Sequence, residues 1–88
     1  METQSYNTYS IVQEIERLLK VKALWNEVHR FPSGAAMIDI RHNDQFIVIQ
    51  VCSEYVGYSI IDENTGIDSR PDNFFKSEAE FWSWFGKL

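Results

Sequence analysis

The stretch AAMIDIRHNDQFIVIQVCSEYVGYSII, residues 35–61, decides the fold. Asn43 and Asp44 separate two runs of alternating apolar and polar residues, and both residue types tolerate the positive φ angles of a tight hairpin turn. A two-residue turn at this point places apolar residues opposite each other along both runs: Ile40 with Ile47, Ile38 with Ile49, and Ala36 with Val51. We therefore predict a β-hairpin with one apolar face.

A second two-residue turn at Ser53-Glu54 extends the same pattern to a third strand. It places apolar residues opposite each other once more: Val51 with Val56, Ile49 with Tyr58, and Ile47 with Ile60. A slip of one residue in either turn would destroy the agreement between the two registers. Two independent turns that give one common apolar face predict an antiparallel meander.

Two amphipathic helices flank this meander. Ser10 and Gln13 fit a capping box, and an apolar stripe at helical spacing follows them, so residues 1–9 are expected to be frayed. Ser77 and Glu80 fit a second capping box before the last helix. Its apolar face is formed by Phe81, Trp84, Phe85 and Leu88, and Phe74 and Phe75 can close the edge of the core.

Residues 24–31 fit two alternatives. The apolar stripe of the first helix changes phase at Val21, Leu24 and Val28. The favoured alternative ends the helix near residues 22–24 and begins a strand at Trp25; the other continues the helix to His29. The predicted fold is a single α+β domain over residues 1–88: an antiparallel three- to four-stranded β-meander with an N-terminal and a C-terminal helix packed on one face. The order is α-β-β-β-β-α, or α-β-β-β-α if the first helix is long.

Composition restricts the class of protein. With 44% hydrophobic residues, the 88-residue chain is too apolar for a disordered protein. A single cysteine excludes an internal disulfide and favours a reducing, cytoplasmic setting. No apolar run approaches the roughly 20 residues that cross a membrane, and residues 1–7 lack the features of a signal peptide.

The negative charge of the chain lies in its C-terminal half. The net charge is −5; residues 1–42 hold five acidic and five basic side chains, whereas residues 43–88 hold eight acidic and three basic ones. This distribution argues against direct binding of nucleic acid or of an anionic membrane. The natural complement is a protein with a basic surface.

The residues that carry chemistry do not form a known catalytic or metal-binding motif. Cys52 and His42 lie at opposite ends of the predicted hairpin strand, roughly 23 Å apart at 3.3 Å per residue. His29 and His42 have no metal-ligand spacing, and the acidic segment from Asp62 lacks the glycine and glutamate positions of an EF-hand. We predict no catalytic residue, no metal site and no cofactor.

The second face of the predicted sheet is the best candidate for a binding surface. It carries an apolar patch of Met37, Phe46, Val48 and Ile61 with polar neighbours, which is typical of a partner site. The alternative is that residues 62–75 fold over this patch and bury it. Trp82 is a further candidate contact, because it lies about 100° around the last helix from Phe81 and follows the acidic segment.

The predicted function is a small acidic protein-binding module without enzymatic activity. This profile is typical of inhibitors that occlude a nucleic-acid-binding or nuclease surface, a class that includes toxin-immunity proteins and phage anti-defence proteins such as CRISPR inhibitors. The predicted contact residues are Met37, Phe46, Val48, Ile61, Asp62, Glu63, Asp68 and Trp82. The alternative is a structural or regulatory homodimer, joined through the second sheet face or through an edge strand.

Overall fold

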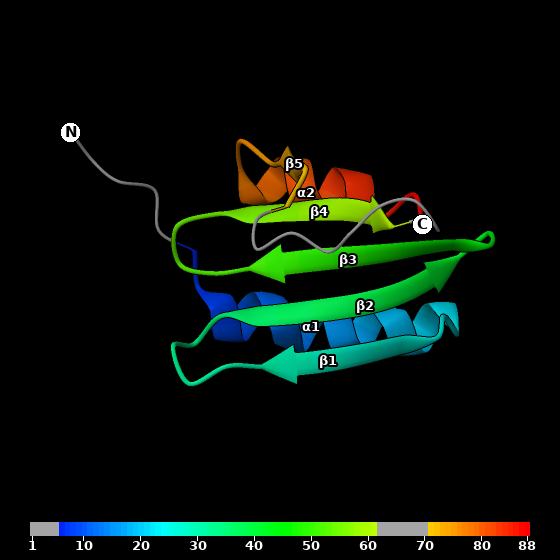
Figure 1. Ribbon diagram of the computed structural model, residues 1–88, viewed down its shortest axis with the longest axis horizontal. Coiled ribbons are helices and arrows are strands. Elements are labelled where there is room, and N and C mark those ends of the chain that lie inside the picture. Colours follow the sequence, from blue (N-terminus) through cyan, green and yellow to red (C-terminus); the bar gives the residue numbers. More distant parts are fainter. Residues whose placement is uncertain (1–5, 62–70) are drawn as a thin grey trace.

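The computed structural model, which describes residues 6–61 and 71–88, has the predicted α+β architecture (Figure 1). Helix α1 and helix α2 flank five strands that form one antiparallel sheet in the order β1-β2-β3-β4-β5. The elements are α1 (Thr8–Lys22), β1 (Asn26–Arg30), β2 (Ala36–His42), β3 (Gln45–Val51), β4 (Val56–Ile61), β5 (Asn73–Phe74) and α2 (Glu78–Phe85). The meander is confirmed, and the two-residue strand β5 adds one strand to the predicted three or four.

Both predicted hairpin registers are confirmed. Asn43 and Asp44 have φ angles of 50° and 64°, as a tight two-residue turn requires. Ile47 lies opposite Ile40 on one side and opposite Ile60 on the other. The Ser53-Glu54 turn is closed by the amide of Cys52, which donates to the carbonyl of Tyr55 at 3.0 Å.

The favoured alternative for residues 24–31, a strand, is also confirmed. Helix α1 ends because Ala23 adopts a left-handed conformation, with φ 56°, and its amide donates to the carbonyls of Leu19 and Lys20. The chain then reverses, and β1 pairs along the length of β2, with Val28 opposite Ile38. The phase change of the apolar stripe therefore marks the end of the helix.

The predicted start of α1 is wrong. The helix begins at Thr8, and the side chain of Asn7 caps it by accepting a hydrogen bond from the amide of Ser10 at 3.1 Å. Ser10 is therefore inside the first turn and not at the cap. Residues 6–9 are also not frayed, because Tyr6 is buried and its amide donates to the carbonyl of Ser53 at 2.9 Å; residues 1–5 lie outside the described residues.

The predicted cap of α2 is confirmed in its main contact. The hydroxyl of Ser77 accepts a hydrogen bond from the amide of Glu80 at 3.1 Å. The carboxylate of Glu80 accepts from the amide of Lys76, at 3.5 Å, and not from the amide of Ser77 as a full capping box requires.

Both helices cover the same face of the sheet, which we call the helix face (Figure 1). It is a continuous apolar layer in which isoleucines of β2 and β3 pack with α1 and with Phe81 and Phe85 of α2. Phe75 closes this core beside Tyr58, as predicted, whereas Phe74 is exposed. Neither α1 nor α2, the helices of the described ranges, is long and apolar enough to cross a membrane.

Candidate functional site

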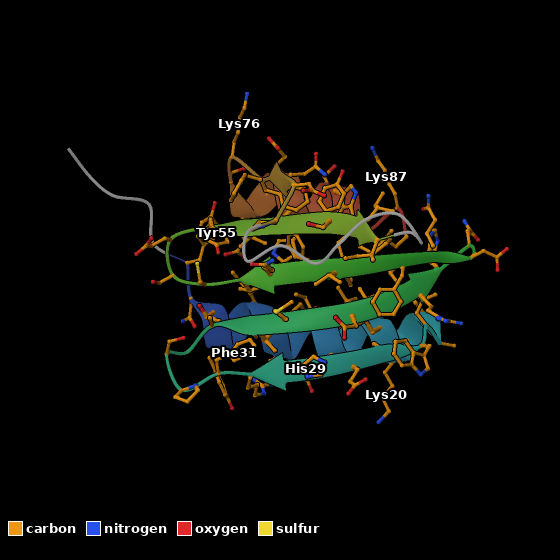
Figure 2. The ribbon with its side chains drawn as sticks, in the orientation of Figure 1. Lys20, His29, Phe31, Tyr55, Lys76 and Lys87 are labelled. Carbon is orange, nitrogen blue, oxygen red and sulfur yellow. The ribbon has the colours of Figure 1, made fainter. Side chains whose placement is uncertain are left out.

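The opposite face of the sheet, which we call the outer face, is the candidate site. Because side chains alternate along a strand, this face carries every second one. These are Glu27 and His29 on β1, and Met37, Asp39 and Arg41 on β2. It is turned to the viewer in Figures 1 and 2, because the helices lie behind the sheet. Figure 2 labels His29 on β1, with Phe31 and Tyr55 near one end of the sheet.

The middle of the outer face is closed over β3 and β4. Val48 is only 2% exposed although it points away from the helices, and its neighbours Gln50 and Ser59 are also buried. The hydroxyl of Ser59 accepts a hydrogen bond from the amide of Asp72 at 2.9 Å. This part of the predicted apolar patch is therefore sealed and unavailable to a partner.

Gly57 allows the chain after residue 70 to lie directly on β4. A β-carbon at this position would be 2.4 Å from the carbonyl oxygen of Asn73 and 2.6 Å from the ring of Pro71. Only a residue without a side chain permits this approach. Residues 71–73 thus cover Gly57 and Ser59 before Phe75 enters the helix side of the core.

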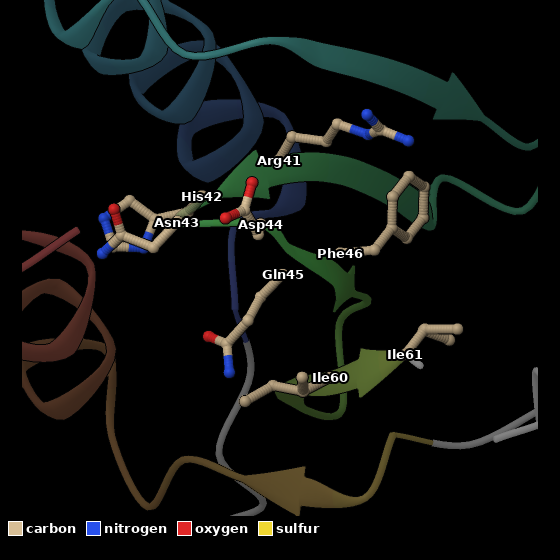
Figure 3. A pocket seen from close by; sticks show the side chains of 8 residues that line it. All are labelled: Arg41, His42, Asn43, Asp44, Gln45, Phe46, Ile60 and Ile61. Carbon is tan, nitrogen blue, oxygen red and sulfur yellow. The ribbon is translucent and has the colours of Figure 1, made fainter. Parts of the chain in front are cut away.

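One end of the outer face carries an exposed aromatic pair. Trp25 precedes β1 and is half exposed, and its ring centroid lies 6.2 Å from that of Phe46 on β3. The amide of Arg41 donates to the carbonyl of Trp25 at 3.1 Å, which fixes these residues in one cross-strand row. An open hollow of about 750 Å³ lies at this end of the sheet and extends around it: Arg41, Phe46 and Ile61 line it from the outer face, His42, Gln45 and Ile60 from the helix face, and Asn43 and Asp44 from the turn (Figure 3).

The other end of the outer face is also aromatic. Phe31 and Phe74 are 45% and 46% exposed, and the ring of Tyr55 meets that of Phe74 edge-on with centroids 5.3 Å apart. Phe31 and Tyr55 line a smaller hollow of about 270 Å³ together with Met37 and Cys52. Sequence reasoning missed Trp25, Phe31 and Tyr55, and it placed the exposed Phe74 at the edge of the core. Trp25 and Phe31 had a usable signal, because they have the same strand parity as Glu27 and His29.

Between the two aromatic ends lies a group of three titratable side chains. The Nε2 atom of His29 lies 3.0 Å from Oδ2 of Asp39 and 3.8 Å from Oε1 of Glu27. Glu27 and His29 are two residues apart on β1, and Asp39 lies opposite Glu27 on β2. The register between β1 and β2 was not predicted, so this convergence was also missed.

The predicted contact residues lie in different parts of the structure and differ in exposure. Met37, Phe46 and Ile61 lie partly exposed on the outer face, whereas Val48 is buried there. Trp82 is separate from them, because it packs against the core on the helix side. Its indole Nε1 donates to Glu78 at 3.0 Å. Asp62, Glu63 and Asp68 lie outside the described residues.

Cys52 and His42 are far apart, as predicted. His42 lies opposite Gln45 at the tight turn of the β2–β3 hairpin, and Cys52 follows Val51 at the other end of β3. These two side chains therefore do not form a thiol–imidazole pair.

The described ionisable groups with perturbed pKa values lie away from the outer face. Burial, and then the negative charges of Glu78 and Glu80, raise the pKa of the Tyr6 phenol above its usual value. On the exposed surface of α1, the hydrogen bond from Arg17 lowers the pKa of Glu14. Neither group belongs to a cluster on the sheet.

Comparison with known proteins gives no relative for this arrangement: no protein-family model, no curated protein and no solved structure matches the chain.

Proposed function

We propose that this chain is a non-enzymatic protein-binding module that recognises a partner with a basic surface through the two aromatic ends of its outer face. The observation that carries the proposal is the exposure of Trp25, Phe31 and Phe74 around a closed centre. Large aromatic side chains are enriched at interface hot spots, because each buries much area with few rotatable bonds.

The shape of the outer face supports contact with a protein more than capture of a small molecule. The two hollows that it borders are open, and they lie at the two ends of the sheet, at the β2–β3 turn and beside the Ser53-Glu54 turn. A partner that spans the face would cover both hollows and all three exposed rings. A small ligand is usually enclosed in a single concave pocket.

The charge of the chain supports a basic partner. The net charge is −5, and carboxylates of Glu27 and Glu54 are exposed near the aromatic residues. Arginine or lysine side chains of a partner would pair with these carboxylates and stack on the exposed rings. An inhibitor that occludes a nucleic-acid-binding or nuclease surface, as immunity and phage anti-defence proteins do, has this chemistry.

The charge component is tested by the salt dependence of binding. The immobilised chain is used to capture a partner from a lysate of the cells that encode this chain, and the partner is identified by mass spectrometry and purified. The dissociation constant of the complex is then measured at low and high salt. We expect affinity to fall steeply with salt, because surface charge pairs are screened. Triple reversal Asp62→Lys, Glu63→Lys and Asp68→Lys should abolish capture, whereas the control Glu14→Lys with Glu16→Lys, on α1, should retain it. Binding that is independent of salt and of the triple reversal would contradict a basic partner.

A homodimer is the second candidate function, and the free edge of β1 favours it. The amide of Phe31 donates to the carbonyl of Ala35 at 2.9 Å, so the odd-numbered residues of this strand bond to β2. Asn26, Val28 and Arg30 therefore direct their N–H and C=O groups away from the sheet. Two copies paired antiparallel about Val28 would place Glu27 opposite His29 of the second copy.

Analytical ultracentrifugation tests this dimer with a charge swap. Glu27→Lys removes the carboxylate that accepts from His29 of the second copy, and it should shift the equilibrium towards monomer. Adding His29→Glu to Glu27→Lys restores an opposite pair and should restore the dimer. A wild-type chain that sediments as a monomer at every concentration would remove this candidate.

A further inference from the structure

Three metal-ligating side chains meet on the outer face between its aromatic ends. One ligand atom of Glu27, one of His29 and one of Asp39 all lie within 4.8 Å of one another. We propose that these residues bind a divalent transition-metal ion of the zinc class. This site does not depend on the proposed partner, because it uses only side chains of β1 and β2.

The strands position the three ligands. Glu27 and His29 share a face of β1 because side chains alternate along a strand, and Asp39 projects from the facing position of β2. Asp39 is the least exposed of the three, with 18% of its side chain accessible, and its Oδ2 atom lies 3.0 Å from Nε2 of His29. The side chains of His29 and Glu27 are more open, and an ion can enter from solvent between them.

The distances fit a tetrahedral ion. Zinc binds imidazole nitrogen and carboxylate oxygen at roughly 2.0–2.2 Å, so adjacent ligand atoms of a tetrahedron lie about 3.3–3.6 Å apart. The Nε2 atom of His29 is 3.0 Å from Asp39 and 3.8 Å from Glu27, so two edges of the tetrahedron differ from this range by only a few tenths of an ångström. The side chain of Glu27 is exposed and can rotate to shorten the third edge.

The donor set selects the class of ion. One imidazole with two carboxylates suits zinc and its transition-metal neighbours, whereas calcium and magnesium prefer ligand sets made of oxygen alone. Three protein ligands leave one tetrahedral position for a water molecule or for a donor from a partner. A metal ion here would replace the hydrogen bond between His29 and Asp39.

The test is a titration of the chain with zinc chloride, followed by isothermal calorimetry. All variants carry Cys52→Ser, because a thiolate binds zinc by itself, and they are compared at a concentration at which sedimentation shows one species. We expect one zinc ion per chain, and a loss of affinity of more than about tenfold in His29→Ala and in Asp39→Asn. The matched control His42→Ala removes the other histidine, at the β2–β3 turn, and should bind zinc as the Cys52→Ser parent does.

A second readout locates the ion. The ring signals of His29 should shift on addition of zinc in a nuclear magnetic resonance spectrum, and those of His42 should not. Circular dichroism checks that His29→Ala remains folded, which its exposed position leads us to expect. The absence of saturable binding, or equal binding by the Cys52→Ser parent and by its His29→Ala variant, would overturn the proposal and leave only a histidine–aspartate hydrogen bond.

Discussion

The two faces of the sheet differ in how far their side chains are exposed to solvent. The helix face is one uninterrupted apolar layer, in which Ile38, Ile40 and Ile49 are fully buried under α1 and α2. The outer face is divided: aromatic side chains are exposed at both ends, titratable groups lie between them on β1 and β2, and β3 and β4 are sealed in the middle. The same strands thus supply a core on one side and a segmented surface on the other, so we expect that stability and the proposed recognition can be altered separately.

The largest effect is expected on the helix face. Ile49→Ala removes a fully buried side chain beneath the helices and should lower the free energy of unfolding by about 3–4 kcal/mol, measured by urea denaturation. Ile60→Ala makes the same chemical change on the same face, where the side chain is exposed, and should cost less than about 1 kcal/mol. Similar losses in the two variants would show that the layer is not closed at Ile49.

The second-largest effect on stability is expected where residues 71–73 cover β4 on the outer face. Gly57→Ala places a β-carbon against Pro71 and the carbonyl of Asn73, and should cost about 1–3 kcal/mol in the same measurement. Gly86→Ala is the control, because Gly86 has helical φ and ψ angles at the end of α2, and it should cost less than about 1 kcal/mol. If Gly57→Ala is as stable as wild type, residues 71–73 do not lie on β4.

The smallest effect concerns Tyr6 and appears only at high pH. The folded chain holds the proton of this phenol more tightly than the unfolded chain does, because its pKa is raised. The free energy of unfolding should therefore fall as the pH rises above the ordinary tyrosine pKa of about 10 and continue to fall through the raised value. Tyr6→Phe should show a shallower fall than wild type in denaturation curves at increasing pH; identical slopes would place Tyr6 outside the core.

Local patterns predicted the helix face well. Asn43-Asp44 and Ser53-Glu54 are short turns, so each register followed from nearby residues and from the match of isoleucine with isoleucine. The cap of α1 was misassigned because Asn7 and Ser10 are equally good capping residues and the spacing to Gln13 favoured the wrong one. Tyr6, which precedes the true cap, is held by a tertiary contact, the hydrogen bond from its amide to the carbonyl of Ser53.

The outer face was harder to predict because its character depends on contacts between distant segments. The hydroxyl of the buried Ser59 accepts a hydrogen bond from the amide of Asp72, and the chain reaches Asp72 only after the acidic segment that begins at residue 62. The meeting of His29 with Asp39 requires the register of β1 on β2, which no short turn motif specified. The exposed ring of Phe74 requires the crossing of the chain at β5, where Phe75 turns to the other face.

The most direct test of the central claim compares partner affinity after exposed apolar side chains are removed from the outer face or from α1. The outer-face variant combines Trp25→Ser, Phe31→Ser and Phe74→Ser; the control is Val21→Ser, which removes an exposed apolar side chain of α1. We predict that the outer-face variant loses more than about a hundredfold in affinity for the captured partner, since hot-spot residues each contribute about 2 kcal/mol or more, while the control binds as wild type. Wild-type affinity in the outer-face variant, with loss of binding in the control, would place the recognition surface on the helices instead.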